Sequence, residues 1–456
     1  MQQRYIYVMS KTASPSARLL KTFSLAAVIF LTVSGGPYGL EPLTQYAGKN
    51  GALLLLLLVP LLWDLPSILM VLELNSLMPV NGGYYKWVDR ALGKRWAFFE
   101  GWWTWLYSFT DLAIYPVLFV TYVGYFFPVI QEWKVPIMLV IIWGSAGLNI
   151  LGIVPVGRVS LILGAIIIIP FLALFGTAFF SSSIHFTMPT PSLNGIGFSA
   201  IGMALYTVMW NFLGWDNTTT YAGEVDKPVR SYIISTFIAF ALVIFLYVVT
   251  TYITQNSGVN FAELNDKMYP LLGQKIGGQW LAAMLAVGGM ASALGIFSAV
   301  MLSISRIPKS MADDKLLPKW FAIEHKRLKT PYVSILITSI VVSFMALKSF
   351  TELIVIDVIL YGAGIALEFI SLVVLRIKEP DAPRPFKIPL NTFLLTLLMI
   401  LPIGVYAVAL IGELSNPEGS NTQIYFAIGA LLTAPIAWLV VKWSSKENST
   451  TDTPNI

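Results

Sequence analysis

The chain has 456 residues, of which 56% are hydrophobic and only 12% are charged, and its formal net charge is +5. Soluble domains carry roughly 25% charged residues, so this composition excludes an ordinary water-soluble domain and indicates a membrane protein. Cysteine is absent and only two histidines occur, which excludes disulfides and thiolate sites and argues against a histidine-based metal or catalytic centre. The basic surplus is expected to follow membrane topology, so no nucleic-acid partner is predicted.

Polar segments flank the apolar part of the chain. Residues 1–18 are polar and basic, and the apolar stretch after them is too long for a signal peptide and has no clear small-residue cleavage site. We therefore expect a cytoplasmic tail over residues 1–18 and a single transmembrane domain over residues 19–445. Residues 446–456 are rich in Ser, Thr and Asn and are expected to form a disordered cytoplasmic tail.

Twelve stretches of the chain are apolar enough to span a bilayer. A spanning helix needs about 20 mainly apolar residues, because no backbone polar group can stay unpaired in lipid. The connections are too short for a separate soluble domain, so the sequence predicts an all-α polytopic membrane protein with twelve transmembrane helices. The predicted spans, numbered 1 to 12 in chain order, are residues 20–46, 51–79, 97–127, 135–152, 156–180, 197–222, 232–254, 279–305, 331–348, 352–376, 389–412 and 423–443.

Basic residues are distributed as expected for a multi-pass protein, in which Lys and Arg gather in the short cytoplasmic loops. With twelve spans, one side of the membrane receives all but five of the 29 basic residues. We therefore expect a protein of the plasma (inner) membrane with both termini in the cytoplasm. The five exceptions are Lys49, Lys134, Lys267, Lys275 and Lys348.

Acidic residues, unlike basic ones, fall deep inside the predicted spans. A charge inside a bilayer is costly and is usually kept for function. An acidic interior therefore predicts a cationic solute, a coupling cation or both; the plainer alternative is that some of these carboxyl groups are protonated or paired with backbone. The interior residues are Asp64, Asp111, Asp216, Asp357 and Glu368, with Glu41 and Glu73 nearer the span ends.

Spans 1 and 6 carry a polar, glycine-bearing break near their centres. The break in span 1 reads TVSGGPYG over residues 32–39, and Gly and Pro there interrupt the helical hydrogen bonds. The freed amides of Gly35 and Gly36 would form an anion site that suits a substrate carboxylate. The break in span 6 reads MWNFLGWDN over residues 209–217, where freed carbonyls and Asp216 would accept a substrate ammonium group.

The two breaks lie five spans apart, which indicates an internal repeat. Broken helices at matching places in two halves of a membrane protein are the best sequence pointer to a carrier's binding site at the bilayer midplane. The sequence therefore predicts two inverted five-helix repeats, spans 1–5 and 6–10, followed by two additional helices. A Gly-Gly pair alone would more simply be a helix-packing contact, but the paired placement favours a carrier.

An ordered series of short motifs extends over most of the chain. The motifs are SGGPYG at 34–39, NGGY at 81–84, EG at 100–101, YPVLF at 115–119, AGEV at 222–225, TP at 330–331, LEF at 367–369 and RPFKIP at 384–389. Together they resemble the amino acid–polyamine–organocation (APC) superfamily, and within it the plant-type polyamine uptake carriers and their bacterial relatives. The resemblance implies a permease, not an enzyme, that moves amino acids or related amines by alternating access. It would be a proton-linked carrier, working by symport, or an exchanger.

Residue roles follow from the breaks and from the resemblance, which implies that Trp210 covers the substrate and that Asp216 couples helix movement or contacts the amine. The predicted substrate-binding residues are Ser34, Gly35, Gly36, Asp111, Trp210, Asn211, Gly214 and Asp216. The predicted gating and coupling residues are Tyr115, Trp215, Glu224 and Asp357. No catalytic residue, metal site or cofactor is expected.

The chain departs from the plant-type pattern at two places. Span 8 has Ser298 and Val300 near positions where those carriers have acidic residues, and span 5 lacks the interior lysine of some proton-coupled relatives. We therefore expect amino acids as substrates, with polyamines such as putrescine and spermidine as the alternative. Protons are the expected coupling ion and sodium the alternative. A channel or a non-transporting sensor is the alternative of another class, and a monomer or weak homo-oligomer in the lipid bilayer is expected.

Overall fold

The computed structural model describes residues 19–181, 184–187, 190–415 and 422–451. The predicted N-terminal tail and the last five residues lie outside this part of the chain. The described residues form helices and their connections, with two isolated bridges and no β-strand among them. The predicted all-α class is therefore confirmed.

Helices are found in all twelve of the predicted stretches. Among the described residues, eight helical segments are long and apolar enough to cross a membrane, and four apolar helices are shorter. The helices in these stretches are α2 (Thr22–Val33), α3 (Glu41–Val59), which continues through a π-helical turn (Pro60–Asp64) into α4 (Leu65–Leu77), α6 (Lys94–Gly124), α7 (Lys134–Ile150), α8 (Ile153–Phe180), α9 (Phe198–Trp210), α10 (Pro228–Asn256), α12 (Gln279–Ile304), α14 (Tyr332–Met345), α15 (Phe350–Lys378), α16 (Thr392–Leu414) and α17 (Thr422–Thr451).

Three further helices lie in connections between the predicted spans. They are α5 (Gly83–Leu92), α11 (Phe261–Gly277) and α13 (Arg306–Asp313). The first of them buries Trp87 and Val88 against the bundle while Arg90 stays exposed. A short helix with one apolar face has too little hydrophobic length to be found by a search for membrane spans.

The C-terminal helix is longer than predicted from the sequence. α17 continues to Thr451, so residues 446–451, which were expected to be disordered, are helical. No glycine or proline interrupts the chain between the predicted end of span 12 and Pro454, so the helix continues into the polar segment without a breaking residue.

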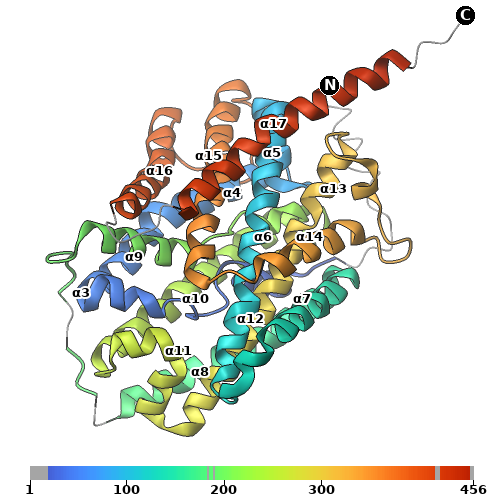
Figure 1. The fold of residues 1–456 in the computed structure, drawn as a ribbon. Helices are drawn as coiled ribbons and strands as arrows, with labels where there is room; N and C mark the ends of the chain where they lie inside the picture. The colour runs from blue at the N-terminus through green and yellow to red at the C-terminus, as the bar shows by residue number, and fades with distance from the viewer. Residues whose placement is uncertain (1–18, 182–183, 188–189, 416–421, 452–456) are drawn as a thin grey trace, which may run out of the picture.

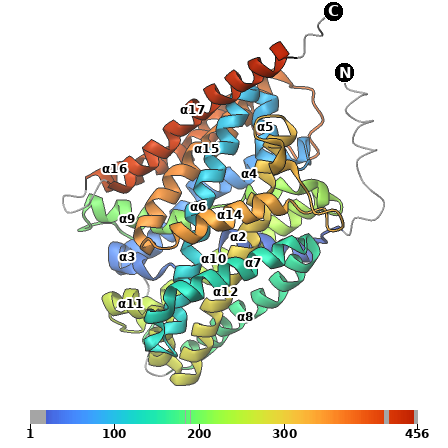
Figure 2. The same cartoon turned by 45° about the vertical axis from the view of Figure 1, so that its right-hand side comes forward.

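Three helices form the centre of the bundle. α6, α12 and α15 bury 72–83% of the residues in their most apolar stretches, and α6 packs against both of the others. By contrast, α16 and α17 bury only 17–22% and expose apolar side chains such as Phe393 and Leu439. An apolar outer face suits lipid rather than water. Figures 1 and 2 show α6 passing through the middle of the bundle and α16 and α17 lying along one side.

The first break in the helices lies between α2 and α3. α2 ends at Val33 and α3 begins only at Glu41. Between them Gly35, Gly36 and Gly39 have φ of 60°, 95° and 96°, in the left-handed region that glycine adopts without steric cost. The glycines of the SGGPYG motif are therefore required by the path of the backbone.

The second break follows α9, which ends at Trp210. The chain then runs without regular helix to a short 3-10 helix, η3 (Asn217–Thr220). The hydroxyl group of Tyr247, from α10, lies 2.7 Å from the Ser34 hydroxyl and 2.8 Å from the Asn211 carbonyl oxygen. One side chain thus ties the two breaks together inside the bundle.

Candidate functional site

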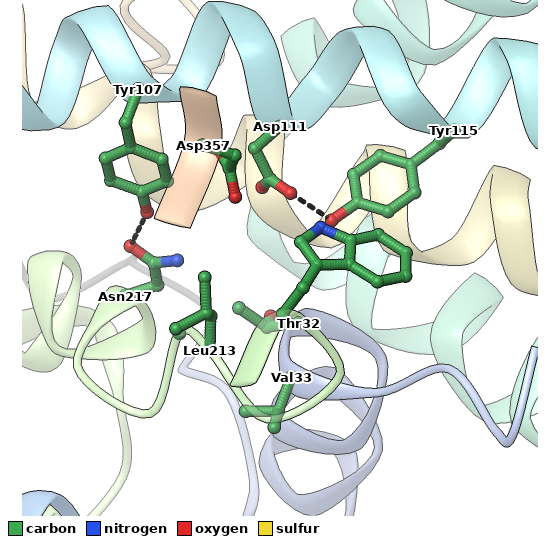
Figure 3. A pocket seen from close by; sticks show the side chains of 10 residues that line it. Thr32, Val33, Tyr107, Asp111, Tyr115, Leu213, Asn217 and Asp357 are labelled. Carbon is green, nitrogen blue, oxygen red and sulfur yellow. Dashed lines mark hydrogen bonds between the residues drawn. The ribbon is translucent and has the colours of Figure 1, made fainter. Parts of the chain in front are cut away.

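A small cavity lies where the two breaks meet α6 and α15. Figure 3 shows the side chains that converge on it. The lining residues are Thr32 and Val33 of α2, Tyr107, Asp111 and Tyr115 of α6, Trp210 of α9, Leu213, Gly214 and Asn217 of the segment after α9, and Asp357 of α15.

α6 gives the cavity a polar face. Tyr107, Asp111 and Tyr115 are spaced four residues apart, and side chains at that spacing lie one above the other on a helix. The Tyr115 hydroxyl donates a hydrogen bond to Asp111, and the Tyr107 hydroxyl donates to the side-chain oxygen of Asn217 at 2.7 Å. The second of these bonds ties α6 to the second break, as Figure 3 shows.

Two buried carboxyl groups face the cavity, Asp111 from α6 and Asp357 from α15 (Figure 3). They are 6% and 1% exposed, and they are close enough for their charges to interact. Within the described part of the chain neither forms an ion pair, and neither oxygen of Asp357 has a hydrogen-bond partner. A buried charge is costly unless a partner compensates it. The pair is therefore suited to a cationic ligand, which would supply that partner.

Aromatic rings surround the two carboxyl groups. The Trp210 ring is stacked on Tyr115 with centroids 6.3 Å apart and meets Phe350 edge-on at 5.5 Å. Tyr107 meets Tyr361 edge-on at 5.4 Å. The face of an aromatic ring attracts an ammonium group by about 0.5–2 kcal/mol. Carboxyl groups and ring faces are both groups that attract an organic cation.

The span 1 amides that would bind a carboxylate are hydrogen-bonded within the chain. The Gly36 amide donates to the Ser34 hydroxyl oxygen at 3.0 Å, and the Gly35 amide donates to the Phe30 carbonyl at 2.9 Å. Ser34, Gly35 and Gly36 are not among the residues that line the cavity. A substrate carboxylate would have to displace these bonds, whereas an ammonium group would meet carboxyl oxygens that have no partner.

Three other residues expected at the site or in coupling lie behind the cavity wall. Asp216 accepts a hydrogen bond from the Tyr361 hydroxyl at 2.6 Å, and the indole nitrogen of Trp215 donates to Asp64 at 3.1 Å. The side-chain amide of Asn211 donates to backbone carbonyl groups. These residues hold the second break in place and do not line the cavity.

Glu224 lies in a contact between distant segments, away from the cavity. Its carboxylate pairs with the Arg306 guanidinium of α13 at 2.8 Å, and its backbone carbonyl accepts the Leu20 amide at 3.0 Å. The side-chain oxygen of Asn81 accepts the Gly223 amide at 3.0 Å. These bonds join the start of α2, the turn before α5, the segment after η3 and α13.

The cavity thus brings together part of the set selected from the sequence. The selected residues that line it are Asp111, Tyr115, Trp210, Gly214 and Asp357. The lining residues that were not selected are Thr32, Val33, Tyr107, Leu213 and Asn217. Each of these five carried a usable signal, because Tyr107 stands one helical turn before Asp111 and the other four lie within the two break motifs.

Comparison with known proteins identifies the family. Residues 20–433 match the family model described as amino acid permease. The chain belongs to this family. The permease is a multi-pass secondary transporter of the APC type and not an enzyme.

Three relatives are named for amine transport. The permease is 35% identical to a probable polyamine transporter of Arabidopsis thaliana over 86% of its own length and 82% of the relative's. It is 32% identical to the polyamine transporter PUT1 of Oryza sativa subsp. japonica, over 87% and 74% of the two chains. It is 24% identical to a probable agmatine/putrescine antiporter, AguD, of Lactococcus lactis, over 83% and 85%.

Proposed function

We propose that this permease carries a diamine or polyamine of the putrescine class rather than an amino acid. The observation that carries the proposal is the pair Asp111 and Asp357, two buried carboxyl groups that face one cavity without a basic partner among the described residues. A diamine offers two ammonium groups and no carboxylate, so it complements both acids and needs no free amide. Relatives named as polyamine transporters support the same substrate class.

An amino acid is the second candidate, and the sequence of α12 favours it. Ser298 and Val300 are uncharged, and by the resemblance to the plant-type carriers they lie near positions that are acidic there. In this chain Asp357 brings a carboxyl group to the cavity from a different helix, α15. The amides of Gly35 and Gly36, which an amino acid's carboxylate would need, are already hydrogen-bonded. The balance of these contacts favours the carboxylate-free amine.

The proposed architecture has twelve membrane crossings with both termini in the cytoplasm of a plasma-membrane protein. Helices in all twelve predicted stretches and the distribution of basic residues support it. The broken pairs α2–α3 and α9–η3 would be the first helices of two inverted five-helix repeats, which is the arrangement that allows alternating access around a central site.

Alternating access requires a closed end on each side of the site in turn. In the proposed orientation the ion pair of Glu224 with Arg306 lies at the cytoplasmic end and closes it. Trp210, stacked on Tyr115, would cover the substrate from the opposite side. Opening the cytoplasmic side would break the ion pair and the backbone contact with Leu20.

Uptake is proposed to be coupled to protons, with sodium as the alternative ion. The support is that buried carboxyl groups without basic partners take up protons more readily than exposed ones. A substrate ammonium group and a proton can then occupy the same acidic interior in different steps of the cycle.

Uptake into liposomes tests the proposal. The purified permease is reconstituted, and labelled putrescine uptake is measured with an inward proton gradient, with an inward sodium gradient and with neither. We expect saturable uptake that the proton gradient drives and that unlabelled spermidine competes, while neutral amino acids in hundredfold excess do not. Competition by amino acids but not by spermidine would overturn the substrate, and drive by sodium alone would overturn the coupling ion.

A further inference from the structure

A second group of carboxyl groups lies outside the cavity. Glu100 of α6, Asp216 of the segment after α9 and Glu368 of α15 are 1%, 3% and 1% exposed. They come from three different elements of the chain. Within the described residues none of them forms an ion pair, so the group has no basic counter-charge.

Two of the three carboxyl groups are in contact, and the third packs beside them. The side chains of Asp216 and Glu368 are within hydrogen-bonding reach of each other, although neither oxygen of Glu368 meets an N–H or O–H donor. One oxygen of Glu100 accepts the Thr104 hydroxyl at 3.1 Å and the other has no partner. A Cβ placed on Gly364 would lie 3.0 Å from Glu100, so Glu100 packs on α15 one turn before Glu368.

A contact between two carboxyl groups requires a proton. Two ionised carboxylates have no donor to share and repel each other, whereas one neutral carboxyl group donates to the other. The titratable groups that face the cluster are also neutral phenols, namely Tyr84 from α5, Tyr107 from α6 and Tyr361 from α15. None of the described residues gives the cluster a basic counter-charge for a second negative charge.

We propose that Glu100, Asp216 and Glu368 form the site that holds the coupled proton, separate from the substrate cavity. The inference rests on the proposed proton-coupled transport. The step is the protonation of one carboxylate to a carboxylic acid, and the reverse step returns the same proton on the other side of the membrane. The cavity acids Asp111 and Asp357 are then reserved for the substrate.

Short connections link this proton site to the cavity. The Tyr361 hydroxyl donates to Asp216 at 2.6 Å and accepts the Gly214 amide at 3.3 Å. Gly214 lines the cavity, and Asp357 stands one turn before Tyr361 on α15. When the cluster loses its proton, Asp216 and Glu368 repel each other. The second break moves away from α15, and the wall of the cavity moves with it.

The test separates binding and exchange from proton-driven accumulation. Glu368→Gln and Glu100→Gln keep the size of the side chain and imitate the protonated form. In proteoliposomes, putrescine counterflow without a gradient is compared with accumulation under an inward proton gradient, and an internal pH indicator reports proton entry. Glu413→Gln in α16, where Glu413 is 9% exposed and outside the cluster, is the matched control.

We expect both cluster variants to retain counterflow within about threefold of the wild type and to lose proton-driven accumulation and proton entry at least tenfold. The Glu413→Gln control should keep all three activities. Either cluster variant that folds and still accumulates putrescine with the gradient, as the wild type does, would overturn the proton site. If Glu368→Gln does not fold, Glu100→Gln decides, because glutamine can still accept the Thr104 hydrogen bond. A wild type that ignores the proton gradient would instead refute the proposed coupling, and the proton site with it.

Discussion

Asp357→Asn is the substitution that separates a diamine site from any other use of this cavity. Asp357 is 1% exposed and neither of its oxygens is hydrogen-bonded to a described residue, so its whole charge is available to a ligand. A hydrogen bond to a charged group contributes about 1.5–3 kcal/mol. Since each 1.4 kcal/mol changes affinity tenfold, the variant should bind putrescine roughly 10- to 150-fold more weakly.

The choice of ligands isolates the second charge. Putrescine and butylamine have the same four-carbon chain, but butylamine has one ammonium group. If Asp111 holds the first ammonium group and Asp357 the second, the variant should bind butylamine as the wild type does and bind putrescine no more tightly than butylamine. The variant should also be at least as stable as the wild type without ligand, because it removes a buried charge that has no partner.

Calorimetric titration of the purified permease in detergent measures its affinity for each amine, and thermal unfolding measures its stability without ligand. Glu413→Gln again serves as the control for the loss of a buried carboxylate in a membrane helix. Unchanged putrescine affinity in the Asp357 variant would refute the reasoning. An equal loss of affinity for putrescine and butylamine would do the same, because it would show a general disturbance of the cavity.

Three further substitutions have expected outcomes. Gly39→Ala should abolish labelled putrescine uptake, because φ is 96° at this position and the added Cβ would lie 2.5 Å from the Trp210 ring. Gly404→Ala is the control: its added Cβ would meet no neighbouring side chain or segment within 4 Å, so uptake should be unchanged. Trp210→Ala should weaken putrescine binding by about 1–2 kcal/mol through the loss of a cation–π contact, measured by calorimetry. Glu224→Gln should leave the buried Arg306 without its counter-charge and destabilise the protein by about 1–3 kcal/mol, visible as a lower Tm; an unchanged Tm would show that the ion pair is dispensable.

The long helices and the two breaks could be predicted because their signals are local. A span of about 20 apolar residues and a Gly-Pro interruption are visible in one stretch of sequence. α5 and α13 were missed because their apolar residues are few and are buried by contacts with other parts of the chain. The helical end of α17 was missed because its polar composition is also typical of disordered tails.

Part of the site could be predicted for the same reason. Two acids and one aromatic residue stood out inside apolar spans, and all three line the cavity: Asp111, Asp357 and Trp210. The acceptor to which a backbone amide donates its hydrogen bond cannot be predicted in this way. Whether Gly36 is free to bind an anion depends on the local turn, in which the Ser34 side chain accepts its hydrogen.

The acidic cluster illustrates the limit of sequence reasoning most clearly. Asp216 and Glu368 were both visible as acids inside predicted spans, but they are 152 positions apart and nothing local indicates that they meet. Glu100 appeared only as part of a short motif. Their contact follows from the packing of α6 on α15 and from the path of the second break, which are properties of the whole bundle.

A structure of the permease bound to putrescine tests the central claim most directly. We predict one ammonium group within about 3 Å of Asp111, the other within about 3 Å of Asp357, and the carbon chain against Trp210. A diamine bound elsewhere would contradict the account, as would an amino acid in the cavity with its carboxylate on the amides of Gly35 and Gly36.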